Sequence, residues 1–459
     1  MDQQALDSLT RRGGDLMISL SGIRGVLPRG LDPINIVHFA RAFCAITGKK
    51  IIVGNDARPT APIMRHLVLG TLIASGKEVI DIGLAPTPTV KAAVALWKAD
   101  AGIMLSASHN PPEWNAFKFL GKGGFFFGAR ESERLMQALA EDRHGFTDYK
   151  RMGSVSERDA GEAHVKAVLK TIPAATLDAI RKRRYHVVVD AVSGAGREAL
   201  PRLLEELGCK VTRLFCDPHP KGEFPRPPEP TPAALKKFGA LVKSKRAAIG
   251  FALDPDADRL VLGSSGRGAI NEEYTLPLAL LGLPKNVKKG VVVINLSTSN
   301  LIEIVAQERG LKVLRAPVGE ANVVSLMRSR KAVFGGEGNG GVIDPRVPSY
   351  GRDTLSGAAL VLAAMARAGA GSLDELMDAL PPLFMEKRKQ ALAGDVAGTL
   401  EALKAKFPGA QADTTDGLRL DLSEGWIHAR PSNTEPIMRV IAQADSRARL
   451  KALLETAGT

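Results

Sequence analysis

Short apolar runs alternate with longer stretches of helical periodicity along most of the chain. An apolar run such as 101–105 predicts a buried strand, and apolar residues spaced three and four apart, as in 62–75, predict a helix. Because strand and helix repeat in this order, we expect largely parallel sheets covered by helices. The predicted strands are 18–26, 50–54, 79–83, 101–105, 186–192, 211–215, 247–253, 290–296 and 312–316. The predicted helices are 33–47, 62–75, 90–97, 130–142, 198–207, one beginning at 231, 301–309 and 355–368.

The pattern changes after residues 367–372, which are rich in alanine and glycine and predict a linker. Helices at 373–380, 397–407 and 446–457 then alternate with strands at 418–422, 426–429 and 437–443. This order predicts a smaller α+β domain, and a polar stretch at 144–162 predicts a further linker. We therefore predict three α/β domains at 1–150, 151–262 and 263–368, and an α+β domain at 372–459.

Composition and charge narrow the class of protein. The net charge is +13, but the densest basic cluster, 181–184, is short, and the other basic residues are dispersed. This distribution favours a basic surface that attracts a small anionic substrate over a nucleic-acid partner. No apolar run approaches the ~20 residues that span a bilayer, and residues 1–15 lack the apolar segment of a signal peptide. Three cysteines, Cys44, Cys209 and Cys216, have no metal-binding spacing; we expect a cytoplasmic protein without a membrane partner.

The first candidate for chemistry is the loop that follows the predicted strand 101–105. Two prolines, at 111 and 112, end that strand. Ser108 is therefore placed just past the carboxyl end of a strand, where open α/β sheets bind ligands. His109, Asn115 and Lys118 follow within eleven positions of Ser108. A serine on a loop is usually a turn residue, and Ser108 becomes a catalytic candidate because other loops supply the groups that it would need. Near the N-terminus, Arg24 lies between two glycines, which suggests close backbone approach to another group.

The second candidate is the acidic loop Asp254-Pro255-Asp256-Ala257-Asp258-Arg259, which follows the predicted strand 247–253. Three carboxylates at alternate positions can converge on a hard cation, although an acidic surface loop is the alternative. Counted from Asp254, the sixth residue is Arg259 and the twelfth is Ser265, so the calcium loop of an EF-hand does not fit. Three carboxylates leave room for water and phosphate oxygens, which Mg²⁺ prefers.

Two later loops carry groups suited to sugar and phosphate. Glu337 and Asn339 lie in a loop with five glycines in seven residues, 335–341, which could equally be a flexible hinge. Its spacing matches neither a dinucleotide fingerprint nor a P-loop. The other loop has arginines, hydroxyls and backbone N–H groups that could hold a phosphate, with a polar hairpin loop as the alternative. Its candidate residues are Arg430, Ser432, Asn433, Thr434 and Arg439.

In this order, the four loops resemble those of the α-D-phosphohexomutase family. Further similar segments are Ser21-Gly22-Ile23-Arg24-Gly25, Asp56-Ala57-Arg58-Pro59 and Val318-Gly319-Glu320, so that the resemblance spans essentially the whole chain. The family likeness implies a four-domain architecture around a central cleft. It implies an isomerase, an intramolecular phosphotransferase that interconverts hexose 6-phosphate and hexose 1-phosphate through a phosphoserine and a hexose 1,6-bisphosphate. It also implies a phosphosugar as the partner, and a monomer or homodimer.

The resemblance also implies a role for each candidate. Ser108 would carry the phosphoryl group, and Mg²⁺ would bind Asp254, Asp256, Asp258 and a phosphoserine oxygen. Lys118 would move protons. The remaining charged residues around the phosphoryl group would be Arg24, His109 and Arg259. The sugar would contact Gly319, Glu337 and Asn339, and the other phosphate would bind Arg430, Ser432, Asn433, Thr434 and Arg439.

The sequence departs from the commoner family pattern at several positions, most of all in the sugar loop. Pro255 stands where the family usually has glycine, and Asn55 where arginine is frequent. Residues 337–341 are Glu-Gly-Asn-Gly-Gly, where many members have Glu-X-Ser-Gly-His, so Gly341 replaces a histidine. This version of the loop is similar to that of archaeal-type and some bacterial phosphoglucosamine mutases. It favours glucosamine phosphate as substrate, with mannose or glucose phosphate as the alternative. A non-catalytic sugar-phosphate sensor and a metal-dependent phosphatase are more distant alternatives.

Overall fold

A computed structural model describes residues 16–458, apart from 20–21, 142–144, 392–393 and 432–436. The chain divides into two compact units: Met1–Val287 with Asn339–Leu376, and Lys288–Gly338 with Met377–Thr459. The residues predicted as a third domain, 263–368, are thus shared between the units, and the four domain boundaries stay a prediction. Among the described helices, none combines the length and the apolar character needed to cross a membrane.

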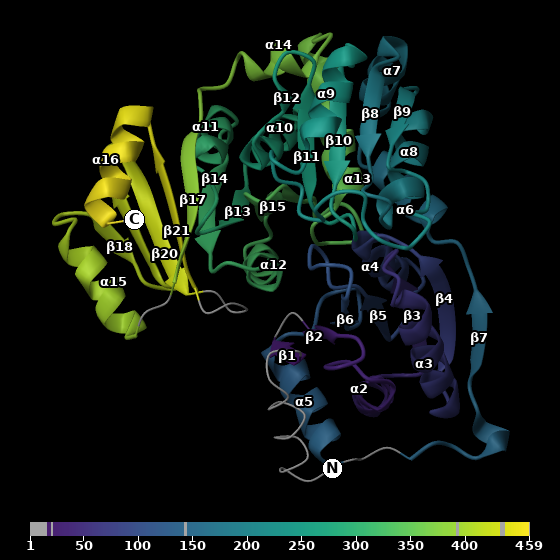
Figure 1. The fold of residues 1–459 in the computed structure, drawn as a ribbon. Coiled ribbons are helices and arrows are strands. Elements are labelled where there is room, and N and C mark those ends of the chain that lie inside the picture. The colour runs from purple at the N-terminus through teal and green to yellow at the C-terminus, as the bar shows by residue number, and fades with distance from the viewer. Residues whose placement is uncertain (1–15, 20–21, 142–144, 392–393, 432–436, 459) are drawn as a thin grey trace. The chain divides into compact units, whose positions relative to one another are not determined.

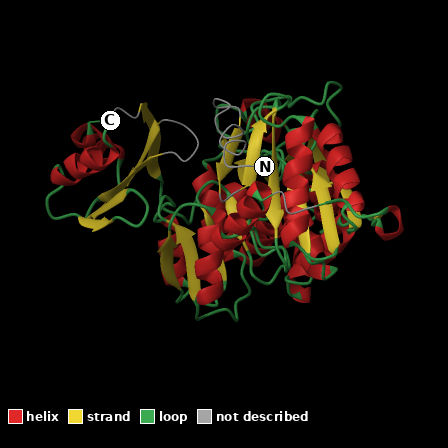
Figure 2. Ribbon diagram, turned by 90° about the horizontal axis from the view of Figure 1, so that it is seen from below, coloured by secondary structure: helices red, strands yellow, loops and turns green. Residues whose placement is uncertain are grey.

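The first sheet of the first unit has the strand order β1-β2-β6-β5-β3-β4-β7. Its central strands β5, β3 and β4 are parallel, as the alternating pattern predicts, whereas β1, β2 and β6 add antiparallel strands at one edge. Helices lie on both sides of the strands in this part of the unit (Figure 2). The strands are β1 (Leu16–Ser19), β2 (Gly22–Val26), β3 (Lys50–Asn55), β4 (Glu78–Leu84), β5 (Ala101–Leu105), β6 (Trp114–Leu120) and β7 (Ser154–Glu157). The helices are α2 (Pro33–Ile46), α3 (Ala61–Ala74), α4 (Thr87–Leu96) and α5 (Ala129–Ala140).

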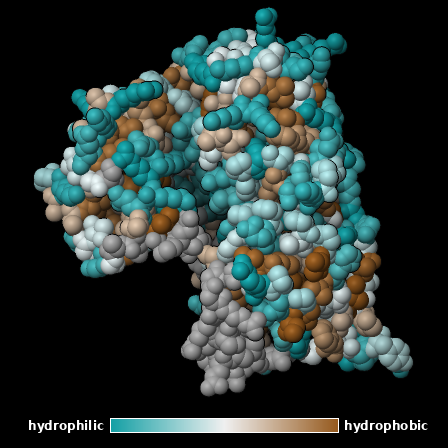
Figure 3. Space-filling view, viewed as in Figure 1, coloured by the Kyte–Doolittle hydropathy of each residue, from teal (hydrophilic) through white to brown (hydrophobic). Residues whose placement is uncertain are grey.

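The core of this sheet is a cluster of stacked phenylalanines beneath α2. Phe43 of α2 stacks on Phe119 of β6 with ring centroids 5.2 Å apart, and Phe119 stacks on Phe127 at 5.7 Å. Asp32 caps α2 by accepting a hydrogen bond from Asn35 N at 2.8 Å. On the face shown in Figure 3, hydrophobic residues gather over part of this unit. Ile34 of α2 and Ile63 of α3 are large hydrophobic side chains that are exposed.

Strand β6 (Trp114–Leu120) was not expected from the sequence, and it changes the position of Lys118. The strand pairs antiparallel with β5, with Met104 opposite Lys118. Lys118 therefore lies within the sheet beside the strand that leads to Ser108, rather than on the loop. Asn115 and Lys118 interrupt the apolar pattern of this strand, and both are buried.

The stretch 144–162, predicted as a linker, contains regular structure that was not predicted. Residues 154–157 form β7, which pairs parallel with β4 at the sheet edge, and 161–169 form the helix α6 (Gly161–Leu169). All four residues of β7 are exposed, so the strand lacks the apolar pattern by which strands are recognised.

The second sheet of the first unit has the order β12-β11-β10-β8-β9. Strands β8, β9 and β10 are parallel, and β10 continues into β11 as an antiparallel pair around the acidic loop. The helix expected from Thr231 begins only at Lys236. The strands are β8 (His186–Asp190), β9 (Lys210–Leu214), β10 (Ile249–Leu253), β11 (Leu260–Ser264) and β12 (Gly268–Ala269). The helices are α7 (Ala174–Arg183), α8 (Gly196–Glu206) and α9 (Lys236–Ser244).

The remaining elements of the first unit include α13, which packs beside this sheet, and η1, which lies near the end of α3. Helix α13 is buried along nearly its whole length against α10, α7 and α8. Asp353 caps it by accepting from Leu355 N and Ser356 N at 3.0 and 3.3 Å. These elements are η1 (Tyr149–Arg151), η2 (Glu272–Tyr274), α10 (Thr275–Leu281), β16 (Gly341–Ile343) and α13 (Thr354–Ala368), and α14 (Leu373–Met377) lies at the end of the unit.

The second unit contains a parallel layer and an antiparallel sheet. In the parallel layer β13 pairs with β14 on one side and β15 on the other. The antiparallel sheet has the order β17-β21-β20-β19-β18, and α15 and α16 lie together beside it (Figure 1). The parallel layer contains β13 (Val291–Asn295), α11 (Leu301–Glu308), β14 (Lys312–Ala316), α12 (Glu320–Ser329) and β15 (Phe334–Glu337). The antiparallel sheet contains β17 (Phe384–Ala391), β18 (Gln411–Asp413), β19 (Leu418–Leu422), β20 (Gly425–Pro431) and β21 (Ile437–Ala444), with α15 (Val396–Ala405) and α16 (Arg447–Ala457).

Candidate active site

Ser108 lies directly beyond the carboxyl end of β5 and faces the acidic loop. Its hydroxyl donates a hydrogen bond to Asp254 Oδ2 at 3.0 Å. The residue has φ of 51°, a left-handed conformation that is uncommon for serine and that clusters at functional sites. Ser106, two residues earlier, donates its own hydroxyl to Asp56 Oδ2 at 2.6 Å and is fully buried. Of these two hydroxyls, only that of Ser108 donates to the acidic loop 254–259.

The backbone around Ser108 is held by Arg58, whose guanidinium is buried. It pairs with Asp56 at 2.9 Å and donates to the backbone carbonyl of Ser108. It also donates to the carbonyls of Asn110 at 2.9 Å, Pro111 at 2.6 Å and Trp114 at 3.0 Å. One cation therefore satisfies three carbonyls of the loop and that of Trp114, the first residue of β6, which fixes the path of the loop.

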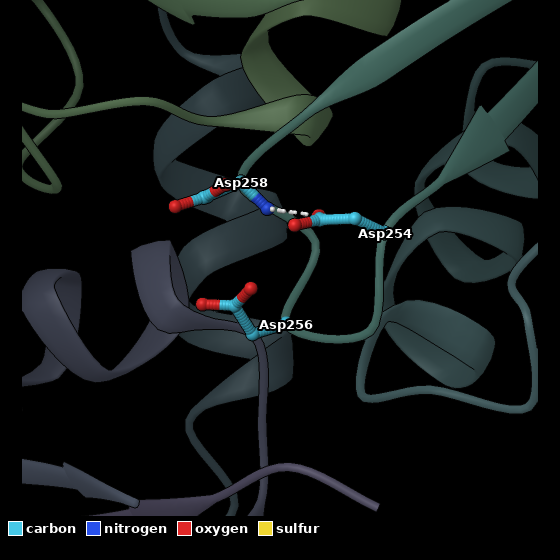
Figure 4. Close-up of side chains that lie close together, drawn as sticks. All are labelled: Asp254, Asp256 and Asp258. Carbon is cyan, nitrogen blue, oxygen red and sulfur yellow. Dashed lines mark hydrogen bonds between the residues drawn. The ribbon is translucent and has the colours of Figure 1, made fainter. Parts of the chain in front are cut away.

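The three aspartates lie together in the loop between β10 and β11, and Figure 4 shows their carboxylates turned toward a common region. One oxygen from each lies within 4.8 Å of the others, and all three side chains are buried. Asp254 Oδ1 accepts from the backbone N–H groups of Asp258 and Arg259, each at 3.1 Å. Ala257 has φ of 53°, the turn that brings Asp256 and Asp258 back over Asp254.

Segments distant in sequence hold this loop from both sides. Thr87, the first residue of α4, donates its N–H to Asp256 O at 2.9 Å and its hydroxyl to Asp256 Oδ2 at 2.5 Å. From the other side, Arg352 donates to Asp258 Oδ2 at 2.5 Å, and Thr354 donates to Ala257 O at 3.0 Å. These contacts fix the loop at the N-terminal ends of α4 and α13.

The electrostatics of the aspartates favour a bound cation. Burial, together with the charges of Asp258 and Asp256, raises the pKa of Asp254 well above its usual range. Burial also opposes ionisation of Asp256, but Lys118 outweighs it and holds that pKa far below the usual range. Among the described residues, Asp256 Oδ1 and Asp258 Oδ1 are buried without a hydrogen-bond partner. Two unpaired carboxylate oxygens in one buried cluster are the ligands that a hard divalent cation such as Mg²⁺ takes.

Lys118 and Arg24 bring positive charge to the same place. Lys118 Nζ donates to Asp256 Oδ2 at 2.6 Å, and the side chain is almost fully buried. Arg24, on β2, donates to Asn110 Oδ1 at 3.1 Å. Burial lowers the pKa of Arg24, against the opposing effect of Asp256. Arg259 donates to Glu229 at 3.1 Å and lies 3.9 Å from Asp258.

His109 lies among cations that oppose its protonation. The charge of Arg259, burial and the charge of Arg24, in that order, lower the pKa of His109 to about 2. We therefore expect the ring to stay uncharged from pH 5 to 9, so that His109 acts through hydrogen bonds and not through positive charge.

This expectation can be tested by an NMR titration of the imidazole signals, with the His109 signal assigned by its loss in His109→Gln. The chemical shifts of His109 should stay constant from pH 5 to 9. A titration near the ordinary value of about 6.5 would show that the surrounding cations do not control the ring.

The sugar-loop residue Asn339 lies in the first unit, close to the acidic loop. The next residue, Gly340, accepts from the backbone N–H of Leu260 at 3.0 Å. Asn339 Oδ1 is buried and has no hydrogen-bond partner within the described ranges. A Cβ at Gly341 would lie 2.3 Å from Cδ of Arg352. The Arg352 side chain therefore occupies the space that the histidine found here in many family members would need.

Glu337 and Gly319 lie together in the second unit. Glu337, at the end of β15, accepts from Gly319 N at 3.0 Å and from Asn295 Nδ2 at 2.8 Å, and is buried. Gly319 has φ of 122° at the start of α12, which favours glycine. The structure thus brings together two predicted sugar-binding residues and adds Asn295.

The second unit also places Arg430 and Arg439 side by side. They are direct partners on the neighbouring strands β20 and β21. Like charges opposite each other destabilise a sheet, so an anion over this pair would be stabilising. Asp416 accepts from Arg430 Nε at 3.1 Å and from Val318 N at 2.8 Å, and so joins Arg430 to the turn at Gly319. The other predicted phosphate-binding residues, Ser432, Asn433 and Thr434, lie outside the described residues.

Sequence reasoning missed several residues that contact the predicted site. Thr87 and Arg352 bind the acidic loop, Arg58 holds the serine loop, and Asn295 and Asp416 contact the second-unit residues. Only Arg58 carried a signal, because it belongs to a segment that resembles the family. The others are isolated polar residues whose partners are far away in the sequence.

Comparisons with known proteins cover nearly the whole chain. Sequence models of the phosphoglucomutase/phosphomannomutase domains match four consecutive parts. They are alpha/beta/alpha domain I at residues 17–145, alpha/beta/alpha domain II at 162–265, alpha/beta/alpha domain III at 272–384 and the C-terminal domain at 393–457. This order confirms the predicted architecture of three α/β domains followed by a smaller C-terminal domain.

Curated relatives are similar over almost their full lengths. The phosphoglucomutase/phosphomannomutase of Thermococcus kodakarensis is 34% identical over 447 residues, which cover 95% of this chain and 96% of the relative. A probable phosphoglucosamine mutase of Pyrococcus abyssi is 32% identical over 443 residues, which cover 95% of this chain and 96% of that protein. Another, of Methanopyrus kandleri, is 33% identical over 440 residues, with 94% and 95% covered.

Solved structures are similar over the same extent. A phosphoglucomutase/phosphomannomutase family protein from Burkholderia thailandensis aligns with a TM-score of 0.82 and 28% identity, over 96% of this chain and 98% of that chain. A putative phosphomannomutase from Thermus thermophilus aligns with a TM-score of 0.81 and 26% identity, over 97% of this chain and 98% of that chain.

Proposed function

Because the chain belongs to the α-D-phosphohexomutase family, as its four loops predict, we propose that this phosphohexomutase interconverts glucosamine 6-phosphate and glucosamine 1-phosphate. The observation that carries the proposed chemistry is the hydroxyl of Ser108, 3.0 Å from Asp254 within the buried group of three aspartates. A nucleophile beside a cation site is what phosphoryl transfer requires, because the protein contributes mainly positioning and charge stabilisation.

In the proposed first half-reaction, the phosphoryl group of phosphoserine 108 passes to a free hydroxyl of the hexose monophosphate. The new P–O bond forms to the sugar oxygen, and the bond to Ser108 Oγ breaks. Lys118, held at 2.6 Å by Asp256 as an ammonium, is the proposed group that gives a proton to Ser108 Oγ as that P–O bond breaks and then takes up the proton that the sugar hydroxyl loses. The bisphosphate then presents its other phosphate, and the same steps in reverse restore phosphoserine 108.

Charge stabilisation comes from residues around Ser108. Mg²⁺, when bound by Asp254, Asp256 and Asp258, supplies positive charge against the oxygens of the transferring group. Arg24 and Arg259 add fixed cations, and neutral His109 can add a hydrogen bond. These residues can therefore oppose the charge that develops on the phosphoryl group.

Within the second unit, two groups of residues have the chemistry proposed for recognising a sugar and a phosphate. Glu337 can accept from two sugar hydroxyls, and its position is fixed by Gly319 and Asn295. Arg430 and Arg439, as strand partners, offer donors in a fork that suits phosphate. Recognition must tolerate two sugar orientations, because the two phosphates exchange roles between half-reactions.

The amino sugar is favoured by Asn339 and by the names of relatives. A substituent at C2 can be recognised only by a group that bonds it, and Asn339 Oδ1 is a buried acceptor that the described residues leave unpaired. The similar proteins of Pyrococcus abyssi and Methanopyrus kandleri are named probable phosphoglucosamine mutases. The relative from Thermococcus kodakarensis, named phosphoglucomutase/phosphomannomutase, supports mannose or glucose phosphate as the second candidate.

Turnover of glucosamine, glucose and mannose 6-phosphates, measured side by side with hexose 1,6-bisphosphate as the proposed activator, tests this function. We expect each active substrate to yield its 1-phosphate, with the highest kcat/KM for glucosamine 6-phosphate. A higher kcat/KM for mannose or glucose phosphate would contradict the amino-sugar proposal. Release of inorganic phosphate in place of the isomer would indicate a phosphatase.

Replacing Asn339 by serine should change the ratio between substrates. Serine lacks the reach of the amide, so the hydrogen bond to the amino group at C2 would be lost. We expect kcat/KM for glucosamine phosphate to fall about fivefold more than that for glucose phosphate, which corresponds to roughly 1 kcal/mol for one hydrogen bond. The two substrates are internal controls for each other. Equal losses would mean that Asn339 supports the loop without recognising the amino group.

A further inference from the structure

Thr89, His164 and Asp353 form a buried chain of polar side chains that the proposed reaction does not use. His164 Nδ1 lies 2.9 Å from Thr89 Oγ1, and His164 Nε2 lies 2.9 Å from Asp353 Oδ2. The His164 and Asp353 side chains are fully buried, and Thr89 is almost so. Since a carboxylate only accepts, Nε2 donates to Asp353. Ser349 donates to the same carboxylate oxygen at 2.8 Å.

The chain joins the N-terminal turns of two helices. Thr89 lies in the first turn of α4, and Asp353 is the residue that caps α13. His164 lies on α6, and the three helices are neighbours in Figure 1. Asp353 also donates its N–H to Val342 O at 2.8 Å, in the strand that follows the sugar loop. His164 is thus the connection between α4 and the start of α13.

The same two turns hold the acidic loop. Two residues before Thr89, Thr87 bonds both the carbonyl and the carboxylate of Asp256. On either side of Asp353, Arg352 donates to Asp258 and Thr354 donates to Ala257 O. Any change in the spacing between the two turns therefore moves Asp256 relative to Asp258.

A buried ionic or polar network is not required for the stability of a fold, because well-packed apolar residues can often replace such a network without lowering the stability. A buried imidazole with both nitrogens bonded does fix the distance between its two partners. We propose that His164 is a positioning residue for the acidic loop: by joining Thr89 to Asp353, it sets the separation of the Asp256 and Asp258 carboxylates and hence the affinity for a divalent cation. This inference rests on the proposed function in one respect, the binding of a cation by the three aspartates.

Direct Mn²⁺ binding, measured by electron paramagnetic resonance on the full-length protein, tests the inference without relying on activity. His164→Phe keeps a flat ring of similar size but removes both bonds, and it should weaken Mn²⁺ binding about 10- to 100-fold, the usual effect of losing a group that orients metal ligands. His164→Gln can still donate to Asp353 and should recover part of this affinity. Val165→Ala is the matched control, because it creates a cavity in the same helix at an equally buried position. It should leave the Kd for Mn²⁺ within about twofold of the wild-type value.

Thr89→Val provides a second variant should His164→Phe not fold, because it removes a single hydroxyl with little change of shape. It should weaken Mn²⁺ binding several-fold. Wild-type affinity in the folded His164 or Thr89 variants, or an equal loss in Val165→Ala, would overturn the positioning role while leaving the cation site intact. Failure of the wild-type protein to bind Mn²⁺ would overturn both the positioning role and the proposed cation site.

Discussion

Replacement of Ser108 by alanine is expected to lower the mutase kcat by roughly 10⁶-fold, the scale on which a covalent nucleophile contributes. The hydroxyl of Ser108 lies 3.0 Å from Asp254, in a loop whose carbonyls Arg58 holds. Ser106 is not expected to take its place in the proposed reaction, because Ser106 donates its hydroxyl to Asp56 from a fully buried position. The rate of 1-phosphate formation from hexose 6-phosphate measures the loss.

Ser106→Ala is the matched control for this prediction. It removes a hydroxyl two residues away and disturbs the N–H of Ser108, which donates to Ser106 Oγ at 2.9 Å. We expect a partial loss of rate, with the phosphoryl group still carried by the protein. If Ser108→Ala retained activity comparable to that of Ser106→Ala, Ser108 would not be the nucleophile.

Removal of the divalent cation is expected to have the second-largest effect. EDTA should lower the rate on the order of 10³-fold, since a metal ion stabilises the charge of a transferring phosphoryl group by several kcal/mol. Mg²⁺ should restore the activity of the wild-type protein. Asp256→Ala should lose activity to a similar extent and should not recover at ordinary Mg²⁺ concentrations, because it removes one of the two unpaired carboxylate oxygens.

Asp344→Ala is the control for the loss of a buried carboxylate. Asp344 is as buried as the three aspartates but pairs with Arg346 outside the acidic loop. Its variant should keep a Mg²⁺ dependence like that of the wild-type protein, whatever its stability. Full activity of Asp256→Ala, or of the wild-type protein in EDTA, would contradict a cation site at this loop.

The parts of the site that could be predicted are those whose place follows from the order of strands and loops along the sequence. Strands β5 and β10 are fully apolar runs of five residues, so their positions followed from the pattern. Asp254 comes directly after β10 and Ser108 three residues after the end of β5, and parallel strands end at one edge of a sheet. Four distinct loops in one order then supported the family resemblance.

The remaining parts could not be predicted because they depend on contacts between distant segments. Strand β6 was missed because Asn115 and Lys118 interrupt its apolar pattern. Their burial is explained by partners that are distant in sequence: Asn115 donates to Thr60 at 3.0 Å, and Lys118 donates to Asp256. Arg352 lies 94 positions from its partner Asp258, and nothing in the sequence near it indicates that contact.

Intact-mass spectrometry of the purified protein, followed by peptide mapping, shows directly whether Ser108 carries the phosphoryl group. We expect a partly occupied single phosphate on Ser108, which hexose 6-phosphate removes as bisphosphate forms and which hexose 1,6-bisphosphate restores. A phosphate that maps to Ser106, or a protein that isomerises hexose phosphates without ever carrying phosphate on Ser108, would contradict this expectation.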